Sequence, residues 1–214
     1  LFIKHLEGAG WPPPGRLANT EVFDRFVGET LKVRGCKIVF FMVDALRYEL
    51  GVALEKLLSE DVSVTLHTAY AQLPTITPVG MASLLPGASN DLSLEREGEA
   101  LIPKLAGATV SNITQRMDVL RKRFGDRFTE IPLTDFLRTK TKLPDKVELL
   151  VLRTTEIDNH LETSPETTLG LIPGTLKQIR VAIQKLRGVG FQDALRRLVK
   201  TKKFSVNAVL TPAS

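Results

Sequence analysis

The chain has 214 residues, of which 43% are hydrophobic and 25% are charged, so it can form one large domain or one domain with a smaller insertion. No apolar run approaches the roughly 18 residues that a membrane-spanning helix needs, and no membrane partner is expected. Cys36 is the single cysteine, which excludes an intramolecular disulfide framework and favours a reducing, cytoplasmic location.

The net charge of +5 is unevenly spread along the chain. Residues 1–110 carry 10 Lys and Arg against 13 Asp and Glu, whereas residues 111–214 carry 19 against 11. The excess in the second half favours an anionic partner, although charge informs about association rather than chemistry. Five cations lie in residues 196–203 without interleaved aromatic residues, so nucleic-acid binding there is a weaker alternative to a solvated tail.

A connector is expected to precede the domain. WPPPG (11–15) is rigid and non-helical, so residues 1–19 are interpreted as an N-terminal connector at a fragment end, and the domain is expected to span residues 20–191. Residues 20–34 have apolar side chains at helical spacing, with Thr20 as the expected N-cap.

A strand, a helix and a second strand follow at the spacing of a βαβ unit. KIVFFMV (37–43) is continuously apolar, which is typical of a strand buried on both faces. Residues 45–58 repeat leucine at helical spacing, and residues 62–70 alternate as a strand does. This order predicts an α/β fold with a parallel sheet.

The second half of the chain is more varied. Residues 88–145 are polar and punctuated by glycine, so they are expected to form an insertion or cap over the sheet, with one helix at 112–124. Residues 147–158 predict a core strand that runs into a loop, and residues 174–191 predict a helix. Residues 192–214 are interpreted as a divergent basic tail.

Asp44 is placed where the strand 37–43 ends and the next helix is expected to begin. Ligands of open α/β sheets bind beyond the carboxyl ends of the strands, and a carboxylate there is a good metal ligand. The alternative is that Asp44 caps the helix through its side chain. Arg47 follows on the expected first turn, where it could bind a phosphate oxygen or be an ordinary surface residue.

Thr77 precedes a proline at the start of a short helix expected at residues 78–87. Threonine followed by proline is typical of a helix start, so a capping role is the simplest interpretation. The free N–H groups at a helix start also favour an alkoxide and a bound phosphate, which suits a nucleophilic hydroxyl. Thr75, two residues earlier, is the competing candidate for the nucleophile.

Asp158 and Glu162 have the spacing D-x-x-x-E. If the segment is helical, the two carboxylates share one face and can bind one ion; in a loop they would be ordinary solvated acids. The sequence contains no P-loop, Rossmann, hydrolase-elbow or zinc-finger motif.

Four segments together resemble the PglZ domain, a branch of the alkaline phosphatase superfamily found in bacterial phage-defence systems of the BREX type. They are VFFMVDALRYELG (39–51), LPTITPVGMASLLPG (73–87), VLRTTEIDNHLE (151–162) and IRVAIQKLRGVGF (179–191). The resemblance implies a mostly parallel sheet flanked by helices, with a cap and an incomplete C-terminal part.

The resemblance also implies a metal-dependent phosphohydrolase or phosphodiesterase, with a phosphodiester or nucleic acid as substrate and other phage-defence proteins as partners. The resemblance implies two metal ions: Asp44 matches a ligand of one, Asp158 and Glu162 match ligands of the other, and Thr77 matches the nucleophile that also contacts a metal. Zinc is the expected ion, with manganese or magnesium as alternatives, and Arg47 is the expected substrate-binding residue.

The chain departs from the family pattern in two places. The family continues with a strand that ends in a D-H-G motif, but basic sequence follows Phe191 here, and His160 stands where a small residue is usual. Truncation of the metal site is one interpretation. The alternative function is therefore a catalytically inactive scaffold or partner-binding module of the defence complex.

Overall fold

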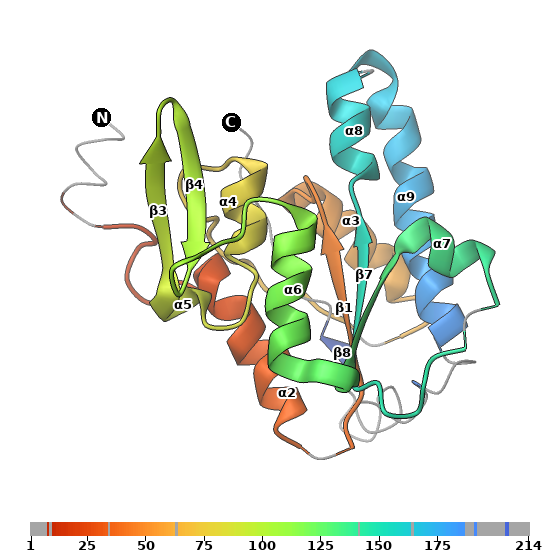
Figure 1. The fold of residues 1–214 in the computed structure, drawn as a ribbon. Coiled ribbons are helices and arrows are strands. Elements are labelled where there is room, and N and C mark those ends of the chain that lie inside the picture. Colours follow the sequence, from red (N-terminus) through yellow and green to blue (C-terminus); the bar gives the residue numbers. More distant parts are fainter. Residues whose placement is uncertain are drawn as a thin grey trace.

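The computed structural model of the chain describes residues 8, 10–33, 35–62, 64–140, 142–163, 165–186, 191 and 204–205. Its centre is a parallel sheet of three strands in the order β1–β7–β6 (Figure 1). The strands are β1 (Ile38–Val43), β7 (Leu149–Thr154) and β6 (Phe128–Pro132). The predicted α/β class with a parallel sheet is confirmed.

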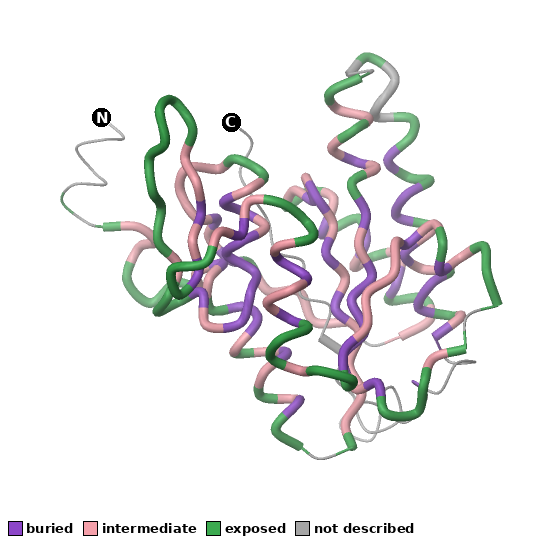
Figure 2. The backbone as a smooth tube through the Cα atoms, in the orientation of Figure 1, coloured by how far each residue is buried: buried purple, intermediate pink, exposed green. Residues whose placement is uncertain are grey.

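β7 is the central strand, and its sequence LLVLRT is buried at every position except Arg153. A strand covered on both faces needs such a continuous apolar run. The register places Ile38 opposite Leu149 and Val43 opposite Thr154, so β1 and β7 end level with each other. Figure 2 shows the buried positions concentrated on the central strands and on the inner sides of the helices.

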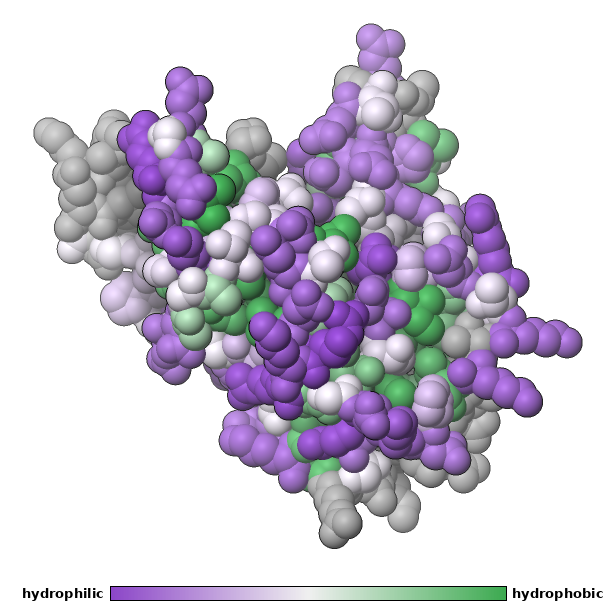
Figure 3. Space-filling model, in the orientation of Figure 1, coloured by the Kyte–Doolittle hydropathy of each residue, from purple (hydrophilic) through white to green (hydrophobic). Residues whose placement is uncertain are grey.

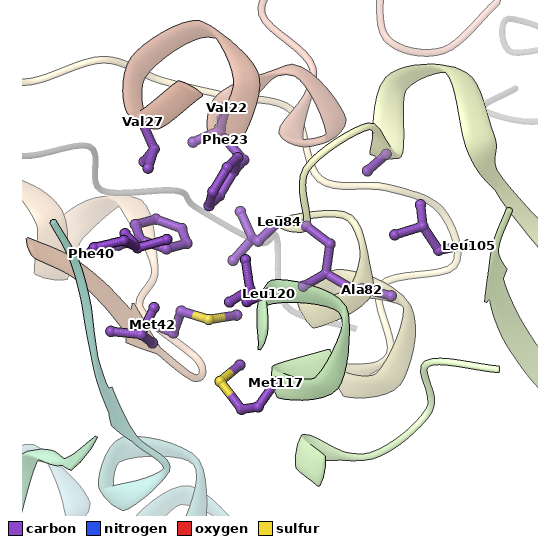
Figure 4. Close-up of a cluster of buried hydrophobic side chains, with 14 of the residues drawn as sticks. Val22, Phe23, Val27, Phe40, Met42, Ala82, Leu84, Leu105, Met117 and Leu120 are labelled. Atoms are coloured by element: carbon purple, nitrogen blue, oxygen red, sulfur yellow. The ribbon is translucent and has the colours of Figure 1, made fainter. Parts of the chain in front are cut away.

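Helices cover both faces of the sheet. One core cluster contains Phe40 of β1 and Val151 of β7 and is covered by an N-terminal helical stretch and by α4 and α6 (Figure 4). These elements are η1 (Asn19–Glu21), η2 (Phe23–Gly28), α2 (Glu29–Leu31), α4 (Thr77–Ala82) and α6 (Ile113–Phe124). The expected helix at 20–34 thus begins one residue early, with Ala18 rather than Thr20 as N-cap.

The opposite face buries Leu150 and Leu152 of β7. Alternate side chains of a strand point to opposite faces, which explains why neighbouring leucines and valines of β7 belong to different clusters. The covering helices are α3 (Tyr48–Leu58), α7 (Leu133–Arg138) and α9 (Pro165–Leu186). The helix expected at 174–191 is therefore longer at its start, and its expected glycine stop lies outside the described residues.

The range 88–145 contributes to two sheets. A separate antiparallel sheet contains β3 (Leu92–Glu97), β4 (Ala100–Leu105) and β5 (Ala108–Thr109), preceded by α5 (Ala88–Asp91). The helix expected at 112–124 is α6, followed by η3 (Gly125–Arg127). β6 was not expected as a strand, and it joins the central sheet beside β7 instead of lying in a cap.

Two other expectations were wrong. The strand expected at 62–70 is only β2 (Val64–Thr65), which pairs in parallel with β8 (Phe204–Ser205), so β1 has β7 rather than β2 as its neighbour. The loop expected after the strand at 147–158 is instead α8 (Glu156–Thr163). None of the described helices combines the length and the apolar character that crossing a membrane would require.

A buried polar contact fixes the position of α4. Ser83, directly after α4, donates its hydroxyl to the Gly80 carbonyl at 2.6 Å and accepts a hydrogen bond from Asn19 Nδ2 at 2.6 Å. Asn19 and Ser83 are 1% and 0% exposed. Two backbone hydrogen bonds join the start of η1 to the chain ahead of α4. The Asn19 N–H donates to the Tyr70 carbonyl and the Tyr70 N–H donates to the Leu17 carbonyl, both at 2.8 Å.

Replacing Ser83 with alanine should lower the free energy of unfolding by about 1–3 kcal/mol, because it leaves the buried Asn19 amide with only the Gly80 carbonyl, at 3.4 Å. Urea denaturation measures the change. Ser93→Ala on the exposed strand β3 is the matched control and should have little effect. Equal stabilities of the two variants would contradict the role of this contact.

Candidate active site at the carboxyl edge of the sheet

Asp44 directly follows β1 and is 8% exposed. Its backbone N–H donates to the Thr154 carbonyl at 3.0 Å, and its Oδ1 accepts from the N–H of Ala45 at 3.0 Å. Helix α3 begins only at Tyr48, with Arg47 as its N-cap. The interpretation of Asp44 as a helix cap was therefore wrong, and its carboxylate remains at the edge of the sheet.

Ala45 has a φ angle of 55°, which places a residue with a side chain in the left-handed region. Such a conformation costs an L-residue about 1 kcal/mol. It turns the chain directly after Asp44, whose carboxylate accepts a hydrogen bond from the Ala45 N–H in the same turn. The acid is therefore oriented by its own backbone turn and not by the helix that follows.

Asp158 and Glu162 lie on α8, which follows the end of β7. The segment is helical, so the condition for the two acids to share one face is met. Burial raises the pKa of Asp44 most, and the negative charge of Asp158 raises it further. The Ala45 N–H and Arg116 lower it, Glu162 raises it slightly, and the result is a pKa of about 6 instead of 3.8. The Asp158 and Glu162 carboxylates are therefore close enough to Asp44 to act on its charge.

The chemistry of these donors suits a divalent cation, because carboxylate oxygens bind hard and borderline metals and the α8 acids disfavour the charge of Asp44. Oδ2 of Asp44 has no hydrogen-bond donor in the part of the chain that the structure describes. Among those same residues, however, no three His, Cys, Asp or Glu side chains gather closely enough to hold a metal ion. The donor type fits a metal, while the described spacing does not complete its ligand set.

Thr77 is the first residue of α4, and Ile76 is the N-cap, in an extended conformation with φ −89° and ψ 148°. The Thr77 side chain is exposed, and Thr75 is half-buried in the preceding loop. Because α4 has six residues, its dipole can favour an alkoxide only weakly. No hydrogen bond joins Thr77 to the three acids within the described residues.

Arg47 is half-buried and forms the N-cap of α3 without a side-chain capping bond. It lies three residues beyond Asp44, on the turn that leads into the helix. No ion pair connects its guanidinium to Asp44, Asp158 or Glu162 within the described ranges. Its expected role in substrate binding stays a prediction.

Arg116 is a site residue that the sequence analysis missed. It lies on the first turns of α6, is 5% exposed and interacts electrostatically with Asp44. Burial lowers the pKa of this guanidinium, and the Asp44 charge partly offsets that effect. The sequence feature that could have revealed it is its position on the apolar stripe of α6, between Ile113 and Met117, where a charged residue needs a partner.

The space-filling view is hollowed between two lobes (Figure 3). One lobe contains α4 and the β3–β4 hairpin, and the other contains α8 and α9 (Figure 1). The carboxyl ends of β1 and β7 and the first turn of α6 lie toward this hollow (Figure 1). Asp44, Arg116 and the α8 acids therefore surround the end of the sheet that open α/β folds use for ligands.

The fold and this edge define an α/β domain of the kind found in alkaline phosphatases. The sequence model of one family, the BREX system PglZ alkaline phosphatase-like domain, matches residues 22–192. The chain belongs to this family, and it is a hydrolase-like domain of a phage-defence system. No curated protein gave a significant match.

Replacing Asp44 with asparagine should remove the part of the pH dependence of stability that comes from the ionisation of Asp44. Because the folded pKa of about 6 lies above 3.8, the native state binds this proton more tightly, and ionising Asp44 destabilises it as pH rises toward 6. Relative to the native sequence, the variant should gain about 2 kcal/mol in free energy of unfolding between about pH 4.5 and about pH 7.5.

Urea denaturation of metal-free protein at the two pH values measures this difference. Asp118→Asn removes a charge from an exposed position of α6 and is the control. A stability difference between Asp44→Asn and the native sequence that is equal at both pH values would contradict the burial of a charged Asp44.

Proposed function

We propose that the chain is a metal-dependent phosphoric ester hydrolase domain that acts on phosphodiesters, nucleic acids included. The observation that carries this proposal is the buried Asp44 at the carboxyl edge of the sheet, with the Asp158 and Glu162 carboxylates acting on it. Membership of the alkaline phosphatase-like family supports the reaction class.

Asp44 and the Thr77 hydroxyl would contact one divalent cation, and Asp158 and Glu162 would hold a second one. Zinc is the preferred ion, and manganese or magnesium are the alternatives. When bound, such a cation polarises a phosphoryl oxygen and lowers the pKa of a hydroxyl at the site.

Thr77 supplies the attacking oxygen. Its hydroxyl releases a proton to the surrounding water, Oγ1 bonds to phosphorus, and the bond from phosphorus to the leaving oxygen breaks. Water then hydrolyses the phosphothreonine and restores the hydroxyl. The exposed position of Thr77 at the start of α4 leaves this oxygen accessible to a substrate.

Arg47 would bind a phosphate oxygen near the start of α3. The positive second half of the chain supports an anionic polymer as substrate. We infer that the domain acts in the bacterial cytoplasm with other proteins of the defence system, as the family name and the single cysteine suggest.

A second candidate function is that of a non-catalytic scaffold in the same defence complex. It is favoured by the absence, among the residues that the structure describes, of three metal-binding side chains at ligand spacing. In this case the α/β fold would be kept while the metal site is lost.

Thr77→Ala should lower the cleavage of an activated phosphodiester by at least about 100-fold, because a threonine nucleophile cannot be replaced by a methyl group. Thr75→Ala is the matched control and should retain most of the activity. The assay measures release of the chromogenic alcohol with zinc or manganese added. Full activity of Thr77→Ala would remove Thr77 from the mechanism.

Zinc titration separates the two candidate functions. The hydrolase should bind zinc at a ratio near one or more per chain, and Asp44→Ala and chelation should both abolish cleavage. Isothermal titration and elemental analysis of the purified protein measure the binding. A folded protein that binds no zinc, manganese or magnesium would support the scaffold.

A further inference from the structure

Arg116 is a buried arginine with most of its hydrogen-bonding capacity unused. Its Nη1 donates to the Ser111 carbonyl at 2.8 Å and to the Val110 carbonyl at 3.4 Å. Within the described residues, Nε and Nη2 have no acceptor. A guanidinium has five N–H donors, so one whole edge of the group lacks a protein partner.

This edge is still open to solvent. The fully buried side-chain atoms without a partner, among the described residues, belong to Asn19, Ser111 and Gln178, and no atom of Arg116 is among them. The residue as a whole is nevertheless only 5% exposed. Two carbonyls therefore fix Nη1 of Arg116, while the Nε–Nη2 edge keeps some contact with solvent.

Helix α6 and strand β1 share a buried cluster, which brings Arg116 within electrostatic reach of Asp44. Met42 and Met117 belong to the same buried cluster and point toward one another in Figure 4. Met117 is the neighbour of Arg116, and Met42 and Asp44 point to the same face of the sheet because strand side chains alternate. The electrostatic interaction between Asp44 and Arg116 agrees with this placement.

A purely structural pair would join the two groups directly, as arginine and carboxylate do in bidentate ion pairs. Here Asp44 accepts from its own backbone turn, and Arg116 donates to the carbonyls before α6. No ion pair connects them within the described ranges. Both groups therefore keep an unpaired side, at the carboxyl edge of the sheet.

We propose that the Nε–Nη2 edge of Arg116 binds two oxygens of a phosphoryl group beside Asp44. The fork of parallel N–H groups matches two oxygens of a tetrahedral phosphoryl group, which a lysine cannot do. The identity of the ligand rests on the proposed hydrolase function, whereas the site rests on Arg116 itself. Arg116 thus adds a buried phosphate ligand to the more exposed Arg47.

Inorganic phosphate is the probe. Isothermal titration of the full chain, with zinc and separately with a chelator, should show binding that Arg116→Gln weakens by roughly 10- to 100-fold, the usual loss for hydrogen bonds to a charged group. Arg116→Lys keeps the charge but not the fork and should also bind more weakly. Arg121→Gln, at an exposed position of the same helix, is the matched control and should bind like the native chain.

Circular dichroism and urea denaturation show whether each variant is folded. If Arg116→Gln does not fold, Arg116→Lys decides: native affinity in that variant overturns the proposal. If neither folds, modification of arginine by phenylglyoxal in the native chain decides, because phosphate should protect Arg116 from the reagent. Absence of that protection, or of phosphate binding to the native chain under both conditions, also overturns it.

The phosphate-binding test can succeed or fail independently of the phosphodiester-cleavage test. Phosphate binding in the presence of the chelator needs neither the nucleophile nor a metal ion, so that titration tests Arg116 alone. A chain that binds phosphate through Arg116 but cleaves no phosphodiester would keep the anion site and refute the hydrolase. Cleavage that is unchanged in Thr77→Ala, together with Arg116-dependent phosphate binding, would refute only the nucleophile.

Discussion

The hydrogen bond from the Asp44 N–H to the Thr154 carbonyl, 3.0 Å long, joins the residue that follows β1 to the last residue of β7 and so continues the parallel ladder to the edge of the sheet. The arrangement of the acidic residues at the candidate site depends on this pairing of β1 with β7. It brings together two chain positions that are far apart in sequence and fixes their ends at the same height. The turn after β1 and the helix after β7 are therefore forced to share one edge, with Asp44 on one and the α8 acids on the other.

This edge is electrostatically unfavourable in the absence of a ligand. Asp44 is buried, the charges of Asp158 and Glu162 disfavour its ionised form further, and Arg116 forms no direct ion pair with it. A folded protein of modest stability tolerates such an arrangement only where the surrounding core over-determines the geometry. The two buried clusters on either side of β7 supply that rigidity, so Asp44 and Arg116 keep positions in which they form no direct ion pair.

The sequence was informative where one local pattern decides the outcome. The apolar run before Asp44 predicted β1, the periodicity of residues 112–124 predicted α6, and the motifs identified the family that the profile match confirmed. Motif order also pointed to the α8 acids, and helix formation there was one of two conditions left open. These features need no knowledge of distant contacts.

Features that depend on distant partners were missed or mistaken. FTEIP is not strongly apolar, and β6 exists because β7 offers it a free edge. The role of Asp44 as a cap failed because the left-handed Ala45 delays the helix start to Tyr48, which local propensity does not reveal. Arg116 could not be identified from the sequence, because its role depends on an interaction with Asp44, which follows a strand more than 70 residues earlier.

The segment before η1 has a consequence for where the domain begins. Trp11 donates its ring N–H to the Ala71 carbonyl at 2.7 Å, Tyr70 and Asn19 share a backbone bond, and Asn19 reaches Ser83. Both ends of the loop that carries Thr77 are thus tied to the same stretch, which removes much of the conformational entropy of loop closure. A recombinant fragment started at residue 22, where the family match begins, would lack those ties and would release the loop from the sheet edge.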